Sequence, residues 1–284
     1  GDEFGTVVSS LDSNLFLVGA PKDDVDTNSI GRAYLFRWSD LGAALVQVFT
    51  NPSPTNTTSF GQSLAAIDTQ TFVIGSVGKS GVNGFAYLYT WNGTTAVLHQ
   101  TLGPGTIDFG ACVARLGPGQ FAVGDPRTGG PGRVYPYLWD GVEAIQQDSI
   151  NEPTSESNTK FGTAIAAVGT QQLIIGSYAK DDLGGGYTDA GSAYLYGWNG
   201  ATWALQATLT NQAVFDDGEQ LGRSVAGLGA NRFAVGAPLA GTSRDGLVFL
   251  YTWTGSAAVP WLVITNPAPG ILGDKFGYAL AALG

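Results

Sequence analysis

The chain has one histidine, one cysteine and no methionine, and only 13% of its 284 residues are charged. A single cysteine, Cys112, has no partner for an internal disulfide, so cysteine usage does not indicate the compartment. One histidine and one cysteine also cannot form a structural His/Cys metal site. No apolar run approaches the roughly 18 residues that a membrane-spanning helix needs, and no window shows the apolar period of a helix.

The chain also has few basic residues: 13 Lys and Arg stand against 23 Asp and Glu, which gives a net charge of −10. Contacts to phosphate need clustered basic side chains, so nucleic acid is not expected as a partner. The acidic balance is interpreted as a device for solubility, with cation binding as the alternative. What the chain has in quantity is glycine, with 42 residues, and 11% aromatics. This composition is typical of many short strands joined by tight turns.

A two-residue word, Phe-Gly, recurs along the chain, and a glycine that closes an apolar run follows 15 residues after each full copy. The pairs are Phe4/Gly19, Phe60/Gly75, Phe109/Gly124, Phe161/Gly176 and Leu221/Gly236, and in the last pair a leucine stands in for the phenylalanine. A constant offset within a repeat of 49 to 60 residues indicates one supersecondary unit in tandem. We predict a single domain with repeats at about 1–58, 59–107, 108–159, 160–217 and 218–273, and a partial sixth repeat at 274–284.

Each repeat has the pattern of a four-stranded antiparallel meander. In the second copy, Tyr87 and Tyr89 lie two apart, so they share one face of a strand. The Asn92-Gly93 word that follows Trp91 is a strong hairpin signal before a fourth strand. Such a sheet cannot bury both of its faces alone. The sequence therefore predicts an all-β protein, a β-propeller of four-stranded antiparallel blades, with five full blades and a lone extra first strand.

At these residues the chain resembles the FG-GAP repeats of integrin α-subunit heads and of bacterial and algal surface proteins. Phe4-Gly5 with Gly19-Ala20-Pro21, and Leu221-Gly222 with Gly236-Ala237-Pro238, carry the resemblance. It implies an extracellular or cell-surface adhesion, ligand-binding or scaffold protein. Calcium-binding members of the family have an Asp-rich loop between the first and second strands. That connection is a three-residue turn in every repeat here, so the family's calcium sites are not carried over and no cofactor is expected.

Variable loops are expected at one end of the meanders, because the 2–3 and 4–1 connections are long and the others are tight turns. Binding residues gather on variable loops that a rigid scaffold holds. The candidate ligand-binding residues are Asp181, Asp182, Tyr187, Asp189, Arg127 and Arg244. Asp24, Asp26 and Asn28 have the first-half spacing of a calcium loop, but the pattern then fails. They are interpreted as a solvated turn, with a weak cation site as the alternative.

An enzyme is not expected. The sole histidine, His99, belongs to a fourth strand, where its counterpart is Gln206, and Cys112 occupies a small-residue position of a buried strand. The leading hypothesis is a non-catalytic extracellular propeller for adhesion, protein–protein interaction or filament assembly. A carbohydrate-binding module is the alternative, with Tyr187 and Trp203 as its test residues, and a polysaccharide-active enzyme comes third.

Asn56 and Asn92 begin N-glycosylation sequons, which are used only if the chain passes through a eukaryotic secretory pathway. The segment 274–284 leaves three alternatives open. The chain belongs to a longer propeller, the extra strand closes a five-bladed ring, or the strand pairs with a neighbouring molecule to build a fibre.

Overall fold

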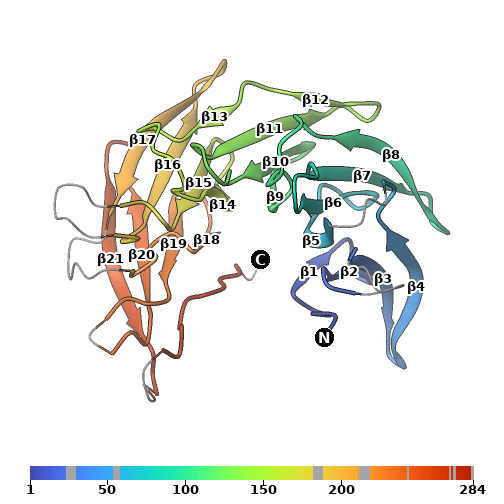
Figure 1. Ribbon diagram of the computed structural model, residues 1–284, viewed down its shortest axis with the longest axis horizontal. Coiled ribbons are helices and arrows are strands. Elements are labelled where there is room, and N and C mark those ends of the chain that lie inside the picture. The colour runs from blue at the N-terminus through green and yellow to red at the C-terminus, as the bar shows by residue number, and fades with distance from the viewer. Residues whose placement is uncertain are drawn as a thin grey trace. The chain divides into compact units, whose positions relative to one another are not determined.

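The computed structural model describes residues 1–23, 30–53, 58–181, 188–210, 218–241, 243–268, 270 and 273–282. These residues form 21 β-strands in five antiparallel sheets (Figure 1). Over these described ranges there is no helix, and hence none long and apolar enough to cross a membrane. The chain divides into two compact units, residues 1–125 with 135–147 (unit 1) and residues 126–134 with 148–284 (unit 2).

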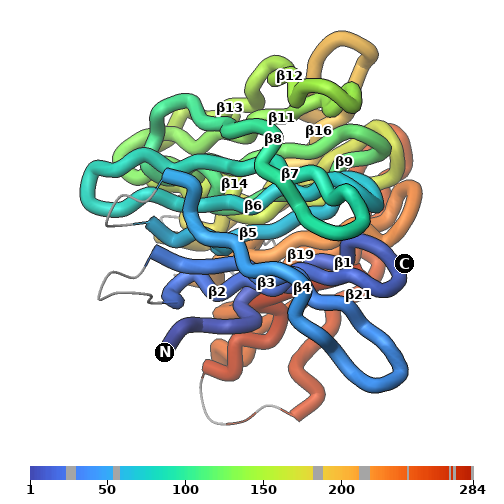
Figure 2. The backbone as a smooth tube through the Cα atoms, turned by 90° about the vertical axis from the view of Figure 1, so that its right-hand side faces the viewer, coloured from blue at the N-terminus to red at the C-terminus, as the bar shows by residue number. Residues whose placement is uncertain are grey.

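Unit 1 begins with two complete sheets. The first has β1 (Val7–Ser10), β2 (Leu15–Ala20), β3 (Arg32–Ser39) and β4 (Gly42–Thr50), which lie side by side in chain order (Figure 2). The second has β5 (Thr58–Ala66), β6 (Thr71–Gly78), β7 (Phe85–Trp91) and β8 (Ala96–Leu102).

The third sheet has β9 (Cys112–Gly117), β10 (Gln120–Asp125), β11 (Arg133–Trp139) and β12 (Ala144–Gln146). A short β13 (Ile150–Asn151) also pairs with β11, so its fourth strand is split in two.

Unit 2 contains the last two sheets. The fourth sheet has β14 (Phe161–Val168), β15 (Gln172–Ser177), β16 (Ser192–Trp198) and β17 (Trp203–Leu209). The fifth has β18 (Ser224–Gly227), β19 (Arg232–Ala237), β20 (Leu247–Trp253) and β21 (Ala258–Thr265). The first and second strands of every sheet are joined by only two to four residues. Four-stranded meanders in tandem confirm the predicted all-β propeller fold.

The fourth strands of four sheets carry a β-bulge at the same place. The register shifts opposite Leu35/Phe36, Leu88/Tyr89, Leu195/Tyr196 and Leu250/Tyr251. The extra residues of the fourth strands are Val46, His99, Gln206 and Trp261. The predicted match of His99 with Gln206 is therefore a structural equivalence. A bulge increases the local twist of the strand and leaves its extra residue outside the ladder.

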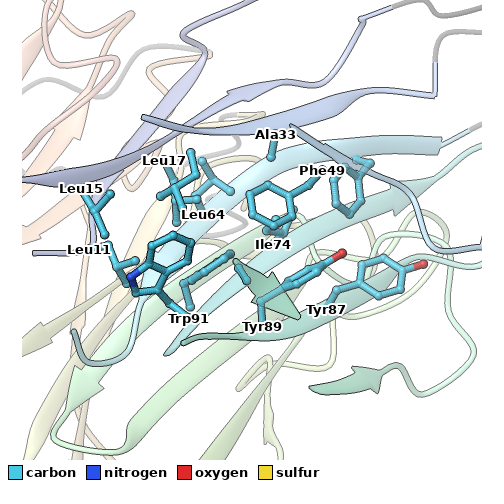
Figure 3. Close-up of a cluster of buried hydrophobic side chains, with 14 residues drawn as sticks. Leu11, Leu15, Leu17, Ala33, Phe49, Leu64, Ile74, Tyr87, Tyr89 and Trp91 are labelled. Atoms are coloured by element: carbon cyan, nitrogen blue, oxygen red, sulfur yellow. The ribbon is translucent and has the colours of Figure 1, made fainter. Parts of the chain in front are cut away.

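The core lies between consecutive sheets of a unit. Leu17 and Phe49 of the first sheet pack in one cluster with Ile74 and Tyr89 of the second (Figure 3). The rings of Phe72 and Tyr89 stack with centroids 5.5 Å apart. Because the aromatic residues of a third strand lie two apart, they point to the same face of their sheet. That face packs against the neighbouring sheet.

The Phe-Gly word marks the contact between consecutive sheets. Phe60 is fully buried, and Gly61 has a φ of +84° with its α-carbon against the carbonyl oxygen of Arg32 in the preceding sheet. A Cβ on Gly19 would in turn overlap the carbonyl oxygen of Gly61. The second repeat thus needs both glycines of the 15-residue offset, because Gly61 meets the preceding sheet and a Cβ on Gly75 would overlap the carbonyl oxygen of Gly110 in the following repeat. Phe4, which no preceding sheet of unit 1 covers, is 59% exposed.

The segment 273–282 docks where a sixth first strand is expected, but it forms no strand. Ser224 Oγ donates to the Gly277 carbonyl over 2.7 Å, and the Phe276 N–H donates to the Asp245 carbonyl over 2.8 Å. Phe276 and Leu280 pack on the fifth sheet. The first strand of a repeat forms its β-ladder with the second strand of the same repeat. The contact of residues 273–282 with the preceding sheet therefore does not make them a strand.

Candidate functional site

The loop end of unit 2 is formed by residues 126–132, 152–160, 178–181, 188–190, 238–241 and 243–246. Backbone hydrogen bonds tie these segments together: Asn158 N–H donates to the Gly130 carbonyl over 3.1 Å, and Ala179 N–H donates to the Thr159 carbonyl over 3.1 Å. The loops are therefore held by the scaffold and by one another.

Left-handed backbone at residues other than glycine is concentrated at this loop end. The positions with positive φ are Arg127 (30°), Ser155 (58°), Asn158 (64°), Lys160 (60°), Asp189 (50°) and Arg244 (54°). Such conformations cost on the order of 1 kcal/mol or more each and persist where the surroundings impose them, often at binding sites. Both arginines predicted to face a ligand, Arg127 and Arg244, are among them.

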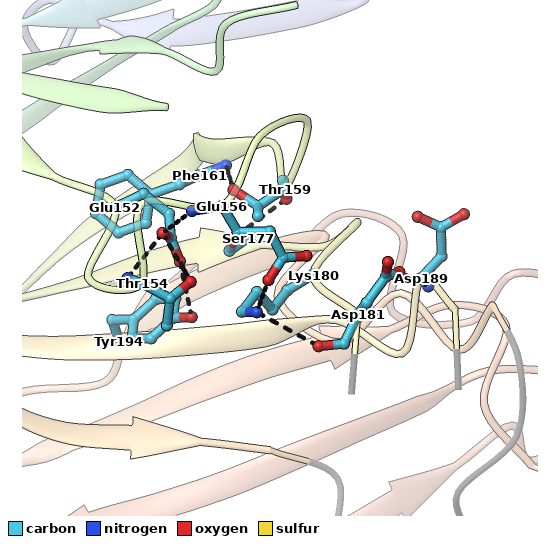
Figure 4. Close-up of polar contacts among 10 residues, drawn as sticks. All are labelled: Glu152, Thr154, Glu156, Thr159, Phe161, Ser177, Lys180, Asp181, Asp189 and Tyr194. Carbon is cyan, nitrogen blue, oxygen red and sulfur yellow. Dashed lines mark hydrogen bonds and ion pairs between the residues drawn. The ribbon is translucent and has the colours of Figure 1, made fainter. Parts of the chain in front are cut away.

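Glu152 organises the linker that enters the fourth sheet. The side chain is 2% exposed, and its carboxylate accepts the Thr154 N–H over 2.8 Å and the Glu156 N–H over 3.1 Å (Figure 4). The Tyr194 hydroxyl donates to the same carboxylate over 3.3 Å. Burial, and then the Glu152 charge, raise the pKa of Tyr194, so its hydroxyl stays a donor.

The same arrangement occurs in unit 1 with a neutral amide. Asn51 Oδ1 accepts the Ser53 N–H over 3.0 Å and the Tyr87 hydroxyl over 2.8 Å. Asn51 stands nine residues before Phe60, as Glu152 stands nine before Phe161. Glu152 therefore has a structural role in forming the linker turn, and its charge is specific to this repeat.

Three further acidic residues, Glu156, Asp181 and Asp189, lie at the loop end together with Lys180. Glu156 forms an ion pair with the Lys180 ammonium, whose side chain is 11% exposed. The Asp189 N–H donates to Asp181 Oδ1 over 2.9 Å. Burial, and then the neighbouring Asp181 charge, raise the pKa of Asp189. An aspartate whose pKa is raised in part by a neighbouring negative charge favours a cationic group nearby.

The other predicted residues have different outcomes. Asp182 and Tyr187 lie outside the described residues, as do Asp24, Asp26, Asn28 and Asn56. Nowhere in the described ranges do three or more His, Cys, Asp or Glu side chains gather as metal ligands do.

Asn92 is exposed in the hairpin between β7 and β8, where its Oδ1 accepts the N–H groups of Thr94 and Thr95 over 2.9 Å and 2.8 Å. Its first role is thus to shape the turn.

His99 and Cys112 also have structural surroundings. His99 Nε2 lies 2.7 Å from the Val142 carbonyl, and its ring meets Trp139 edge-on with centroids 4.9 Å apart. Cys112 is half-buried at the start of β9.

Sequence reasoning did not predict the two clefts between fourth strands of unit 2. One, of about 370 Å³, is lined by Asp148, Ser149, Ile150, Thr202 and Trp203. The other, of about 420 Å³, runs between β17 and β21. Trp203, a test residue of the carbohydrate-binding alternative, is half-buried with its ring centroid 5.4 Å from that of Trp198. Trp261 is 49% exposed, and the Arg232 guanidinium lies 5.3 Å from the centroid of its ring.

Comparison with known proteins supports the fold and one repeat. The FG-GAP repeat family matches residues 146–196. No curated protein sequence matches the chain. Among solved structures, a crystal structure of Sqt1 from Chaetomium thermophilum is similar with a TM-score of 0.60 at 17% identity, over 94% of this chain and 62% of that one.

A second Sqt1 structure from the same organism gives 0.59 at 17% identity, over 92% of this chain and 62% of that one. The chain thus spans less than two thirds of either neighbour. The predicted resemblance is confirmed: residues 146–196 are an FG-GAP repeat, set in a β-propeller fold of four-stranded sheets.

Proposed function

We propose that this protein is a non-catalytic protein-interaction module that receives a cationic segment of its partner at the loop end of unit 2. The observation that carries the proposal is the Asp181–Asp189 pair, in which the Asp189 N–H donates to the Asp181 carboxylate and the pKa of Asp189 is raised by burial and then by the Asp181 charge. A lysine or arginine side chain placed between them relieves their repulsion.

The surrounding geometry supports the same conclusion. Lys180 is already paired with Glu156, so its ammonium group does not serve as the cation between the two aspartates. The strained backbone at Asp189 and Arg244 is held by neighbouring segments, which keeps the surface in place before a partner arrives. The resemblance to FG-GAP repeats favours a secreted or cell-surface protein in adhesion or scaffolding, and calcium at 24–28 stays a minor alternative.

The test is binding of short lysine- and arginine-containing peptides to the purified chain, measured by calorimetry at two salt concentrations. We expect saturable binding that weakens with salt and that D181N/D189N reduces about tenfold. The matched control is D140N, in the hairpin between β11 and β12, which should bind as the wild type does. Equal binding by D181N/D189N and the wild type would contradict the proposal.

A saccharide is the second candidate ligand, and the cleft at Trp203 favours it. An indole face beside the Asp148 carboxylate and the Ser149 hydroxyl offers stacking and hydrogen bonding together. A glycan array distinguishes this function from the first. Saturable glycan binding that W203A removes and W261A retains supports a lectin-like role, and hydrolysis of the glycan would restore the enzyme hypothesis.

A further inference from the structure

The fourth strands of unit 1 are joined by glutamine side chains that bond to backbone. Gln47 on β4 donates to the Ala96 carbonyl over 2.9 Å and accepts the Ala96 N–H over 2.7 Å. Gln100 on β8 makes the same pair of bonds with Ala144, at 3.3 Å and 2.8 Å. In each case a primary carboxamide satisfies both backbone groups of one alanine on the next sheet.

The same place in unit 2 has no glutamine. Gln47 pairs with Leu35 and Gln100 with Leu88, whereas Ala207 pairs with the equivalent Leu195. Ala258 opens β21 opposite Trp253, as Ala96 opens β8 opposite Trp91. The sequence thus keeps the alanine that a carboxamide would bond and replaces the carboxamide side chain by a methyl group.

The backbone of Ala258 is oriented as in the bridged sheets. The Trp253 N–H donates to the Asn231 carbonyl over 2.7 Å, as the Trp91 N–H donates to the Gln70 carbonyl over 2.6 Å. Trp253 and Ala258 are therefore a non-hydrogen-bonded pair of the antiparallel ladder. It follows that the N–H and C=O of Ala258 point away from β20 and toward the side where Ala207 lies.

A groove of about 420 Å³ lies between Ala207 and Ala258, and its volume is within the usual range of about 300–1,000 Å³ for ligand pockets. It is lined by Ala207, Thr208, Leu209, Thr210, Phe249, Tyr251, Ala257, Ala258, Pro260 and Val263. No lining residue is ionisable near neutral pH, because burial raises the pKa of Tyr251 to about 12. A charged group entering here would lose hydration without a partner, whereas a neutral amide would not.

We propose that the groove between β17 and β21 is a peptide-binding site that receives a glutamine side chain of a partner protein. The carboxamide of that glutamine bonds the N–H and C=O of Ala258, as Gln47 bonds those of Ala96. Its aliphatic part and the flanking residues lie against Leu209, Pro260 and Val263. This site is separate from the acidic loop end, and changes at Asp181 and Asp189 leave it intact.

The experiment uses the peptide acetyl-Thr-Val-Gln-Val-Thr-amide and its counterpart with glutamate at the central position. We expect the glutamine peptide to bind at least about tenfold more tightly, because the glutamate cannot donate to the Ala258 carbonyl and brings a charge. In ¹⁵N-labelled protein, the Ala258 amide resonance should shift on addition of the glutamine peptide.

Two variants locate the site. A207Q restores the internal bridge, so it should abolish peptide binding while the protein stays folded. A204Q, on the exposed side of β17, is the matched control and should bind as the wild type does. Equal binding of both peptides, or undiminished binding by A207Q, would overturn the proposal. An Ala258 shift caused by N-acetylglucosamine oligomers and not by the peptide would overturn it too, and assign the groove to an acetamido sugar.

Discussion

Gly19 in β2 faces the carbonyl oxygen of Gly61 in β5, and a Cβ on Gly19 would overlap that oxygen and the Val7 side chain. The two glycines belong to consecutive repeats, so their contact joins one sheet to the next. We expect G19A to lower the free energy of unfolding by about 1–3 kcal/mol, because the obstructing atom is backbone and cannot move alone. Urea denaturation measures this change.

The control for G19A is G117A. A Cβ on Gly117 would meet only Gln120 Oε1 at 3.8 Å, and its φ is not positive, so the substitution should cost little. If the two variants were equally stable, the contact between sheets would not explain the need for Gly19.

A second prediction concerns the buried Glu152. In E152A the Thr154 and Glu156 N–H groups and the Tyr194 hydroxyl lose their acceptor, which should cost about 2–4 kcal/mol. E152Q should cost much less, because Asn51 shows that an amide oxygen suffices at this place. Thermal or urea unfolding compares the two, and a larger loss in E152Q would show that the charge itself is needed.

The third prediction is a pH dependence at Asp189. Because its pKa is raised in the folded state, the folded protein binds this proton more tightly than the unfolded chain does. The stabilising contribution of this proton is present below pH 3.8, the ordinary pKa of an aspartate, and is lost as the pH rises through the raised pKa of Asp189. D189N should therefore be more stable than the wild type at pH 7, with the difference vanishing below about pH 3.8. Unfolding midpoints from pH 3 to pH 7 measure it.

At alkaline pH, Tyr251 should limit stability. Burial raises its pKa from 10.0 to about 12, so the folded state resists ionisation and the unfolded chain does not. Stability falls as pH rises through this window. Y251F should reduce the loss between pH 9 and pH 11.5, seen in urea midpoints. An unchanged slope in Y251F would mean that the remaining buried tyrosines account for the whole effect.

The last prediction concerns the C-terminal segment. Phe276 and Leu280 pack on the fifth sheet, so pairing of this segment with another molecule requires its release. F276A should weaken the docking and increase self-association at high protein concentration, measured by light scattering after size exclusion. The control is K275A, which leaves the apolar contact of Phe276 and Leu280 with the fifth sheet intact. A variant that stays as monomeric as the wild type would remove the fibre hypothesis.

Local patterns in the sequence were enough to predict the sheets. Tyr87 and Tyr89 two apart, followed by Asn92-Gly93, define a strand and its hairpin without reference to any other part of the chain. The Gln47–Ala96 bridge is different, because it joins residues 49 apart on two sheets and depends on a register that no local pattern gives. The same holds for the groove at Ala207, since a missing side chain leaves no motif.

The residues of the loop end are hard to predict from sequence for a related reason. The Asp189 N–H donates to the Asp181 carboxylate, but the residues that make the loop end distinctive also include Glu152 and Lys180, which sequence reasoning left out. Glu152 stands in a Pro-containing linker, and no local motif marks it. Only its alignment with Asn51, nine residues before a buried phenylalanine, reveals the common turn.

The bulge in the fourth strands has a consequence for how such a chain diversifies. Val46, His99, Gln206 and Trp261 occupy one equivalent position, yet they are an aliphatic, an imidazole, an amide and an indole. Because the inserted residue has no ladder partner, its chemistry can change in one copy and leave the other copies unaffected. Each of these four repeats therefore carries a site at which new surface properties arise at little cost to folding.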